Sequence, residues 1–261
     1  MRFKMKSLRN ALHCTLLGFL LLALPFHTGA EPLITLLVGS QNAPKMFVGE
    51  RGEATGYFTE LASAITQRAG IKVNMVAVPW ARALQLAEQG GGLIASLSRT
   101  PEREAIFNYS DPVIEDEIVI VTMKSKGLLA SSLADLKGLK VGLGRGSRYG
   151  PRFVAELPLV MSEEDDNTEQ RLRKLKAGRI DAAILYGGLP SVVFNARLAN
   201  VDMSELVIQP KPLALDKNYL AIAKSRPDGP ALLKRLNIAI AAMKADGTIN
   251  GIMRRWRSPL R

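Results

Sequence analysis

From Glu31 onward, short apolar runs that suit β-strands alternate with segments that have the apolar spacing of amphipathic helices. This alternation constrains the fold strongly, because strands separated by helices usually pair in parallel and need helices on both faces of the sheet. The expected strands lie within residues 34–39, 71–78, 93–98, 118–123, 136–144, 178–186 and 213–223, and the expected helices span about residues 59–68, 80–88, 168–177 and 230–245. The sequence therefore predicts an α/β architecture with largely parallel sheets.

Residues 1–30 have the composition of a secretory signal peptide. Four basic residues and no acids accompany an apolar run over residues 11–26, and Thr28, Gly29 and Ala30 offer a small-residue cleavage site. A membrane anchor is the alternative, but the uninterrupted apolar core is shorter than the roughly 20 residues that span a bilayer. We therefore expect cleavage after Ala30 and export to the periplasm.

Removing this segment changes the chemistry available to the mature chain. It holds both histidines and the only cysteine, which are His13, His27 and Cys14. Disulfides, thiol nucleophiles, Ser-His-Asp triads and metal or haem sites built on these residue types are thereby excluded. The remainder has 31 Lys and Arg against 24 Asp and Glu, a net charge of +7, which suits anionic ligands or solubility near an acidic membrane. We expect no metal, no cofactor and no nucleic-acid partner.

Polar groups appear abruptly at the end of the expected strand over residues 93–98. Ser96 and Ser98 close the strand, and Thr100 can cap a helix that begins at Pro101. Arg103 then lies beside free backbone amides and hydroxyl groups, an arrangement that can bind a carboxylate. An arginine between two glutamates is more often a surface ion pair, so this segment alone leaves both interpretations open.

Two later strands also end in corners that could face a ligand. Residues 145–150 form a glycine-rich turn that could hold an anion on its backbone N–H groups, although they lack the Lys-Ser/Thr ending of a P-loop. Another strand ends at Tyr186. Trp80, at a strand-to-helix corner, could be a core aromatic residue or could stack on a ligand.

Several short motifs, in their order and spacing, resemble the periplasmic solute-binding proteins of family 3, the polar amino acid receptors of ABC importers. These motifs are Gly56-Tyr57-Phe58, residues 98–103, 107–112, 135–138, 178–181 and 247–249 with Trp256, and together they cover nearly all of the mature chain.

The resemblance implies the type II periplasmic-binding-protein fold, in which two α/β lobes joined by two hinge strands hold a ligand in the cleft between them. Lobe 1 would comprise residues 31–112 and 220–261, and lobe 2 residues 113–219. The hinges would fall near residues 113–117 and 215–219, so we expect these two segments to lie side by side. The receptor would act as a monomer and deliver its solute to an inner-membrane ABC permease.

The resemblance also implies roles for individual residues. Arg103 would clamp a ligand carboxylate with help from Ser96 and Ser98, Trp80 would pack on the ligand, and lobe 2 would contribute Ser147 and Arg148 on closing. Amino acid receptors place acids near the positions of Gln41 and Tyr186 to hold the ligand's ammonium group, and this chain has neither acid. We therefore expect a carboxylate-bearing, anionic or neutral polar solute to bind better than a zwitterionic amino acid.

The rival interpretation is a periplasmic enzyme on the same scaffold, similar to cyclohexadienyl dehydratase. Such an enzyme needs a cleft carboxylate with a raised pKa as its acid or base. The candidates are Glu60, Glu115 and Glu117, for which solvent-facing positions are expected from the sequence pattern. A binding protein without catalytic residues is the favoured function.

Overall fold

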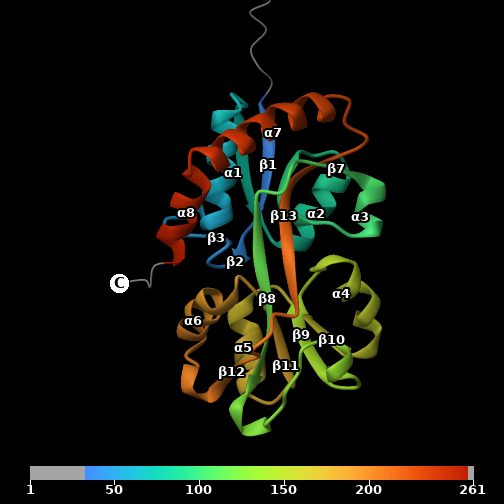
Figure 1. Ribbon diagram of the computed structural model, residues 1–261, viewed down its shortest axis with the longest axis vertical. Helices are drawn as coiled ribbons and strands as arrows, with labels where there is room; N and C mark the ends of the chain where they lie inside the picture. The colour runs from blue at the N-terminus through green and yellow to red at the C-terminus, as the bar shows by residue number, and fades with distance from the viewer. Residues whose placement is uncertain (1–32, 258–261) are drawn as a thin grey trace, which may run out of the picture. The chain divides into compact units, whose positions relative to one another are not determined.

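The computed structural model describes residues 33–257, and the expected signal peptide lies outside them. One ten-stranded sheet has the order β10-β9-β11-β8-β13-β6-β1-β5, with β12 beside β8 and β7 beside β13, and β2, β3 and β4 form a second sheet (Figure 1). The strands are β1 (Ile34–Gly39), β2 (Gln41–Asn42), β3 (Met46–Val48), β4 (Ala54–Thr55), β5 (Val73–Val78), β6 (Leu93–Ser98), β7 (Phe107–Tyr109), β8 (Ile114–Met123), β9 (Lys140–Gly144), β10 (Met161–Asp165), β11 (Ala182–Tyr186), β12 (Leu206–Ile208) and β13 (Ala214–Ala223). The α-helices are α1 (Tyr57–Arg68), α2 (Trp80–Glu88), α3 (Pro101–Ile106), α4 (Gly150–Glu156), α5 (Thr168–Lys176), α6 (Gly188–Ala199), α7 (Gly229–Ala245) and α8 (Thr248–Arg257).

Strands β8 and β13 run antiparallel to each other along the middle of the structure (Figure 1). Their register pairs Ile114 with Asn218 and Ile118 with Ala214. Segments about a hundred residues apart in the sequence are therefore neighbours, which confirms the prediction that residues 113–117 and 215–219 lie side by side.

The expected parallel pairing holds on each side of this central pair. Strand β1 pairs in parallel with β5 and β6, and β9 pairs in parallel with β10 and β11. The pairs that involve β8 and β13 are antiparallel. The sheet is thus parallel within each lobe and antiparallel where the two crossing strands join them.

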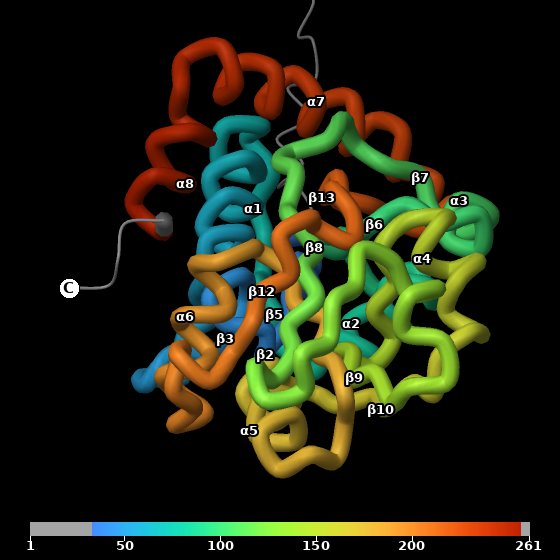
Figure 2. Tube along the Cα trace, turned by 60° about the horizontal axis from the view of Figure 1, so that its bottom comes forward, coloured from blue at the N-terminus to red at the C-terminus, as the bar shows by residue number. Residues whose placement is uncertain are grey.

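Buried apolar residues form separate clusters on the two sides of the crossing strands. Two clusters draw on residues 34–113 and 220–253, and two draw on residues 118–213. In the first group α7 and α8 pack on α1, as Figure 2 shows. In the second group α5 packs on α6. We retain the proposed lobe boundaries because this division of the core falls at the same two crossings.

Helix α6 was not predicted from the sequence. Gly187, Gly188 and Pro190 at its start are turn formers and indicated only a loop after β11. The two glycines have φ of 78° and 60°, a left-handed conformation that costs glycine little. They turn the chain directly from β11 into α6. The sequence therefore shows turn-forming residues at the position where this helix begins.

A buried ion pair joins α5 to the sheet of the second group. The Arg171 guanidinium donates to both carboxylate oxygens of Asp165, at 3.2 and 2.7 Å, and to the carbonyl oxygen of Ile184 at 2.7 Å. Both side chains are 1 % exposed. The guanidinium therefore links α5 to the end of β10 and to β11.

Replacing Arg171 by Met should leave the Asp165 carboxylate buried without a counter-charge. We expect the free energy of unfolding to fall by roughly 3–5 kcal/mol, measured by urea denaturation. The matched control is Arg173→Met on the same helix, because Arg173 pairs with Glu169 at the surface and such pairs contribute about 0–1 kcal/mol. Equal effects of the two substitutions would contradict a structural role for the buried pair.

Candidate functional site

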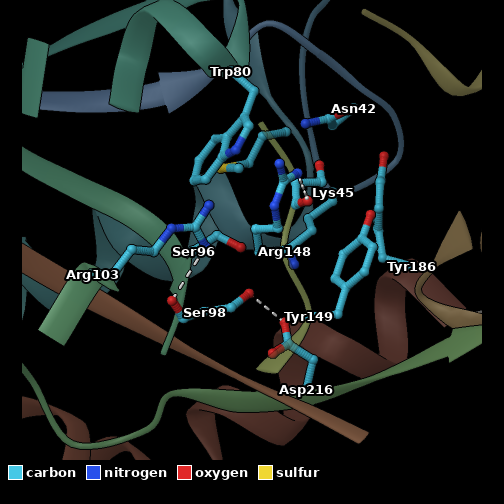
Figure 3. A pocket seen from close by; sticks show the side chains of 12 residues that line it. Asn42, Lys45, Trp80, Ser96, Ser98, Arg103, Arg148, Tyr149, Tyr186 and Asp216 are labelled. Carbon is cyan, nitrogen blue, oxygen red and sulfur yellow. Dashed lines mark hydrogen bonds between the residues drawn. The ribbon is translucent and has the colours of Figure 1, made fainter. Parts of the chain in front are cut away.

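One polar cavity lies where the carboxyl ends of strands from both lobes meet. Its walls come from β6, β13 and the end of β11, and from the segments that follow β1, β5, β6 and β9 (Figure 3). The lining residues are Asn42, Lys45, Met46, Trp80, Ser96, Ser98, Arg103, Ser147, Arg148, Tyr149, Tyr186 and Asp216. They leave a cavity of about 30 Å³, which is room for water but not for an amino acid. An amino acid can therefore enter the cavity only if the side chains or the lobes move.

Arg103 occupies this cavity from the first turn of α3. Thr100 caps the helix as expected, because its hydroxyl oxygen accepts a hydrogen bond from the Arg103 backbone N–H. The guanidinium is buried and donates to the backbone carbonyls of Ser98 at 3.3 Å and of Gly146 at 2.8 Å. Burial lowers the pKa of Arg103. No ion pair between residues 33–257 includes this side chain, so it is a buried cation whose charge is unmatched by a neighbouring carboxylate.

A bulge at the end of β6 aims Ser96 toward the cavity. The register of β6 against β13 shifts so that Leu97 pairs with Tyr219 while Ala95 pairs with Leu220. Ser96 is the extra residue and has φ of 64°, an uncommon conformation for a residue with a Cβ atom. Its hydroxyl group lies 2.7 Å from the Oδ1 atom of Asn218.

Asp216 supplies a carboxylate from the hinge strand β13. It is 5 % exposed, and its Oδ2 atom accepts a 2.6 Å hydrogen bond from the Ser98 hydroxyl group. Burial raises the pKa of Asp216 to about 6, although Lys45 and the Ser98 hydrogen bond oppose that rise. Among the described residues no cation lies within ion-pair distance of it. Asp216 and Arg103 are thus opposite charges in one cavity, each without an ion-pair partner there.

Lys45 is also buried at the cavity, but its charge is matched. Its Nζ atom lies 2.8 Å from Oδ2 of Asp116 and 2.5 Å from Oδ1 of Asn218. It also lies 5.2 Å from the centroid of the Tyr186 ring, a distance at which the ring face attracts a cation. This network ties the loop after β1 to both hinge strands.

The second lobe closes on the loop after β1 through the carbonyl oxygen of Ala43. Tyr186 donates its hydroxyl hydrogen to this oxygen at 3.3 Å, and the Asn195 amide donates at 2.7 Å. Burial raises the pKa of Tyr186, so the phenol remains a neutral donor. These hydrogen bonds and the one between Arg103 and Gly146 join the two lobes across the cavity.

The glycine-rich corner after β9 contributes a second arginine. The Nη1 atom of Arg148 donates to the backbone carbonyl of Ser147 at 2.7 Å and lies 3.4 Å from Oε1 of Glu164. Trp80 stands at the start of α2 on the opposite wall (Figure 3). The corner therefore places the positively charged Arg148 side chain of the second lobe across the cavity from the Trp80 side chain of the first lobe.

The structure brings together all but one of the ligand-binding residues predicted from the sequence. Trp80, Ser96, Ser98, Arg103, Ser147, Arg148 and Tyr186 line the cavity. Gln41 does not line it and is exposed. Successive residues of a strand point to opposite faces, so Asn42 takes the cavity side of β2 in its place.

Lys45, Asp216 and Tyr149 are lining residues that the sequence argument missed. Lys45 lies in the turn between β2 and β3, and two polar residues at alternate positions, Asp216 and Asn218, interrupt the apolar pattern of β13. Polar residues at that spacing inside a strand indicate a shared polar face. This signal was available in the sequence, but nothing in it showed which other side chains that face would meet.

The acids proposed for the enzyme alternative lie away from the cavity. Glu60 accepts hydrogen bonds from Arg255 and Trp256 on α8, and Glu115 and Glu117 line a separate depression beside the hinge. No group of acids, histidines or cysteines within residues 33–257 has the arrangement of a metal site. Asp216 is therefore the one carboxylate among the lining residues of the cavity.

Comparison with known families decides the affiliation of the chain. Residues 34–259 match the family described as bacterial extracellular solute-binding proteins, family 3. The chain belongs to this family. The resemblance inferred from its motifs is confirmed, and so is the two-lobe fold.

Relatives of known name are receptors for amino acids. The chain is 26% identical over 231 residues to the L-cystine-binding protein TcyJ of Escherichia coli, covering 85% of this chain and 82% of the relative. It is 27% identical over 245 residues to ABC transporter arginine-binding protein 1 of the same species, covering 92% and 97%. Among solved structures, an ancestral arginine-binding protein bound to glutamine matches with a TM-score of 0.70 and 26% identity, over 86% of this chain and 97% of the other. No helix in the described part of the chain is long and apolar enough to cross a membrane.

The raised pKa of Asp216 predicts a specific dependence of stability on pH. Between its ordinary value of 3.8 and about 6, the folded protein holds a proton that the unfolded chain has released. The contribution of Asp216 to the free energy of unfolding therefore falls as the pH rises through this interval. Asp216→Asn removes this titration. The free energy of unfolding of the variant, relative to that of the wild type, should therefore rise by on the order of 2–3 kcal/mol between pH 4 and pH 7, measured by urea denaturation.

Asp246→Asn is the control for this experiment. Hydrogen bonds from Thr248 and Arg68 lower the pKa of Asp246 to about 2, so its contribution is present above its ordinary pKa and is lost only as the pH falls toward 2. The difference between this variant and the wild type should change little between pH 4 and pH 7. The same pH profile for both variants would show that burial does not disfavour the Asp216 carboxylate.

Proposed function

We propose that this protein is a periplasmic receptor that captures an α-amino acid in the cavity between its lobes and delivers it to an ABC-type permease. The observation that carries the proposal is the pair formed by Arg103 and Asp216. Both side chains are buried in one cavity, and neither has an ion-pair partner among residues 33–257. The membership of the family and the amino-acid-binding names of the relatives support the same class of solute.

A zwitterion complements this pair of charges. The α-carboxylate would accept two parallel hydrogen bonds from the planar Arg103 guanidinium, which is the strongest geometry for such a contact. The α-ammonium would donate to Asp216, whose carboxylate now accepts one hydroxyl hydrogen bond. Each charged group of the ligand would then offset the free energy lost when the opposite charge of the protein was removed from water. A neutral partner, such as the Ser98 hydroxyl group or a backbone carbonyl, cannot do this alone.

Asp216 overturns the premise of the sequence argument against zwitterions. That argument considered the positions of Gln41 and Tyr186, where no acid stands, and expected uncharged groups alone to meet an ammonium. Tyr186 is instead occupied with the Ala43 carbonyl. The carboxylate comes from β13 instead, so we now expect an amino acid to bind better than its deaminated analogue.

The enzyme alternative is also best judged at Asp216. A buried carboxyl group with a pKa raised to about 6 is suited to proton transfer near neutral pH. The two functions differ in turnover, because a receptor returns its ligand unchanged. Incubation with cyclic carboxylic acids of the dehydratase type, followed by mass spectrometry, should show no product, and accumulation of a dehydrated product that Asp216→Asn abolishes would establish the enzyme instead.

Arg103→Lys tests the carboxylate contact. Lysine keeps the charge but cannot form two parallel hydrogen bonds, so the amino acid found by a thermal-shift screen should bind more weakly by roughly 1.5–3 kcal/mol in calorimetry. Arg99→Lys is the matched control, because Arg99 is an exposed arginine near the same corner and lies 3.7 Å from Glu104. Undiminished affinity in the folded Arg103→Lys variant would remove Arg103 from the site.

Asp216→Asn tests the ammonium contact. The variant keeps a hydrogen-bond acceptor but loses the charge, so it should bind the amino acid less tightly while binding the deaminated analogue at least as well as the wild type does. We expect the preference for the amino acid, measured by paired calorimetry, to fall by about tenfold or more. An unchanged preference would mean that another group holds the ammonium.

A further inference from the structure

The part of the cavity wall beyond Arg103 and Asp216 is rich in hydrogen-bond donors and positive charge. Lys45 and Arg148 both line it, together with the hydroxyl groups of Tyr149 and Ser147. In Figure 3 the Arg148 side chain extends among the other lining side chains below Trp80. If an amino acid places its carboxylate on Arg103 and its ammonium on Asp216, these groups face its side chain.

The acids that accompany the two cations do not line the cavity. Asp116 pairs with Lys45 from the hinge side, where it lines the separate depression, and Glu164 lies 3.4 Å from Arg148 on β10. A ligand therefore meets the ammonium and guanidinium groups and not their counter-ions. A basic ligand side chain would meet like charges in this part of the cavity. It would find no free carboxylate there, since Asp216 would already bind the α-ammonium group of the ligand.

Tyr149 adds a second, independent observation. Its side chain is 7 % exposed and lines the cavity, and within the described structure its hydroxyl group makes no hydrogen bond of normal geometry, although the Ser147 side chain is near enough to lower its pKa. Burial raises the pKa of Tyr149, so the group is a neutral donor. Buried hydroxyl groups are rarely left unbonded, and an acceptor on the ligand would satisfy this one.

We propose that the receptor selects amino acids with an acidic side chain, whose second carboxylate is bound by Arg148 and Tyr149 beside Lys45. This inference rests on the proposed function and specifies the substrate class of the same site. Arg148 is the specificity-determining residue because its guanidinium is held by one backbone carbonyl and a 3.4 Å ion pair and is free to reorient. Lys45 is fixed by Asp116 and Asn218 and acts through its charge.

The experiment is calorimetry of the mature protein with aspartate, glutamate, glutamine, alanine, arginine and lysine. One of the two acidic amino acids should bind tightest, and arginine and lysine should bind at least about a hundredfold more weakly. Arg148→Gln should weaken the acidic ligand by roughly tenfold to a hundredfold and alanine by less than about threefold. Tyr149→Phe removes only the hydroxyl group and should weaken the acidic ligand by several-fold, in proportion to one lost hydrogen bond.

Arg145→Gln is the control variant, because Arg145 belongs to the same corner but is exposed and pairs with Asp166. It should bind every ligand as the wild type does, and thermal unfolding should show that all three variants fold. Tightest binding of arginine or lysine, still dependent on Arg103 and Asp216, would overturn the acidic selectivity and leave the amino acid receptor standing. An acidic ligand that both Arg148→Gln and Tyr149→Phe bind with unchanged affinity would also overturn it. Binding of none of the amino acids would overturn the proposed function itself.

Discussion

The pairing of β8 with β13 is the interaction on which the rest of the structure depends. Each strand leaves one lobe and enters the other, so the hydrogen bonds between them hold the only two crossings among the described residues in one register. That register also places Asp116 directly opposite Asp216. Asp116 comes from β8, while Asp216 and Asn218 come from β13, and all three are buried.

Buried polar groups on a hinge must find partners in the lobes, and this requirement builds the site. Asn218 lies within hydrogen-bond distance of Lys45 and Ser96, and Asp116 pairs with Lys45 and accepts a hydrogen bond from Tyr57. The loop after β1 and the bulge in β6 are thereby positioned relative to the crossing strands. Asp216 is the member of this set without an ion-pair partner among the described residues, which is why we propose it as the group that binds the solute.

Closure and binding depend on some of the same contacts. Arg103 reaches the carbonyl of Gly146 across the cavity, and Tyr186 and Asn195 reach that of Ala43. A carboxylate that replaces the carbonyl contacts of Arg103 gives the guanidinium a charged partner, while the contacts at Ala43 are left in place. Under the proposed function, the ligand would thus strengthen one side of a closure that the protein already makes on the other, and a hinge motion would then select the closed state.

The sequence by itself determined the alternation of strands and helices and the helix cap at Thr100. These two features rest on local patterns, which are the period of apolar residues and a hydroxyl residue before a proline. The two crossing segments were predicted from the resemblance of the sequence to the family. The sequence also indicated seven of the lining residues, because strand ends and the turns after them carry the polar groups that a parallel α/β sheet presents at one edge.

Only the tertiary structure decided which charges are matched and which are free. Lys45 and Asp116 are 71 positions apart in the sequence, and their ion pair joins a cation that lines the cavity to an acid that does not. The packing of segments distant in the chain also determines the bulge that turns Ser96 inward. It likewise leaves Asp216 without an ion-pair partner, and the Tyr149 hydroxyl group without a hydrogen bond of normal geometry, among residues 33–257. Charge balance in a buried site is a property of three-dimensional neighbours, so the sequence supplied the groups of the site but not their partners.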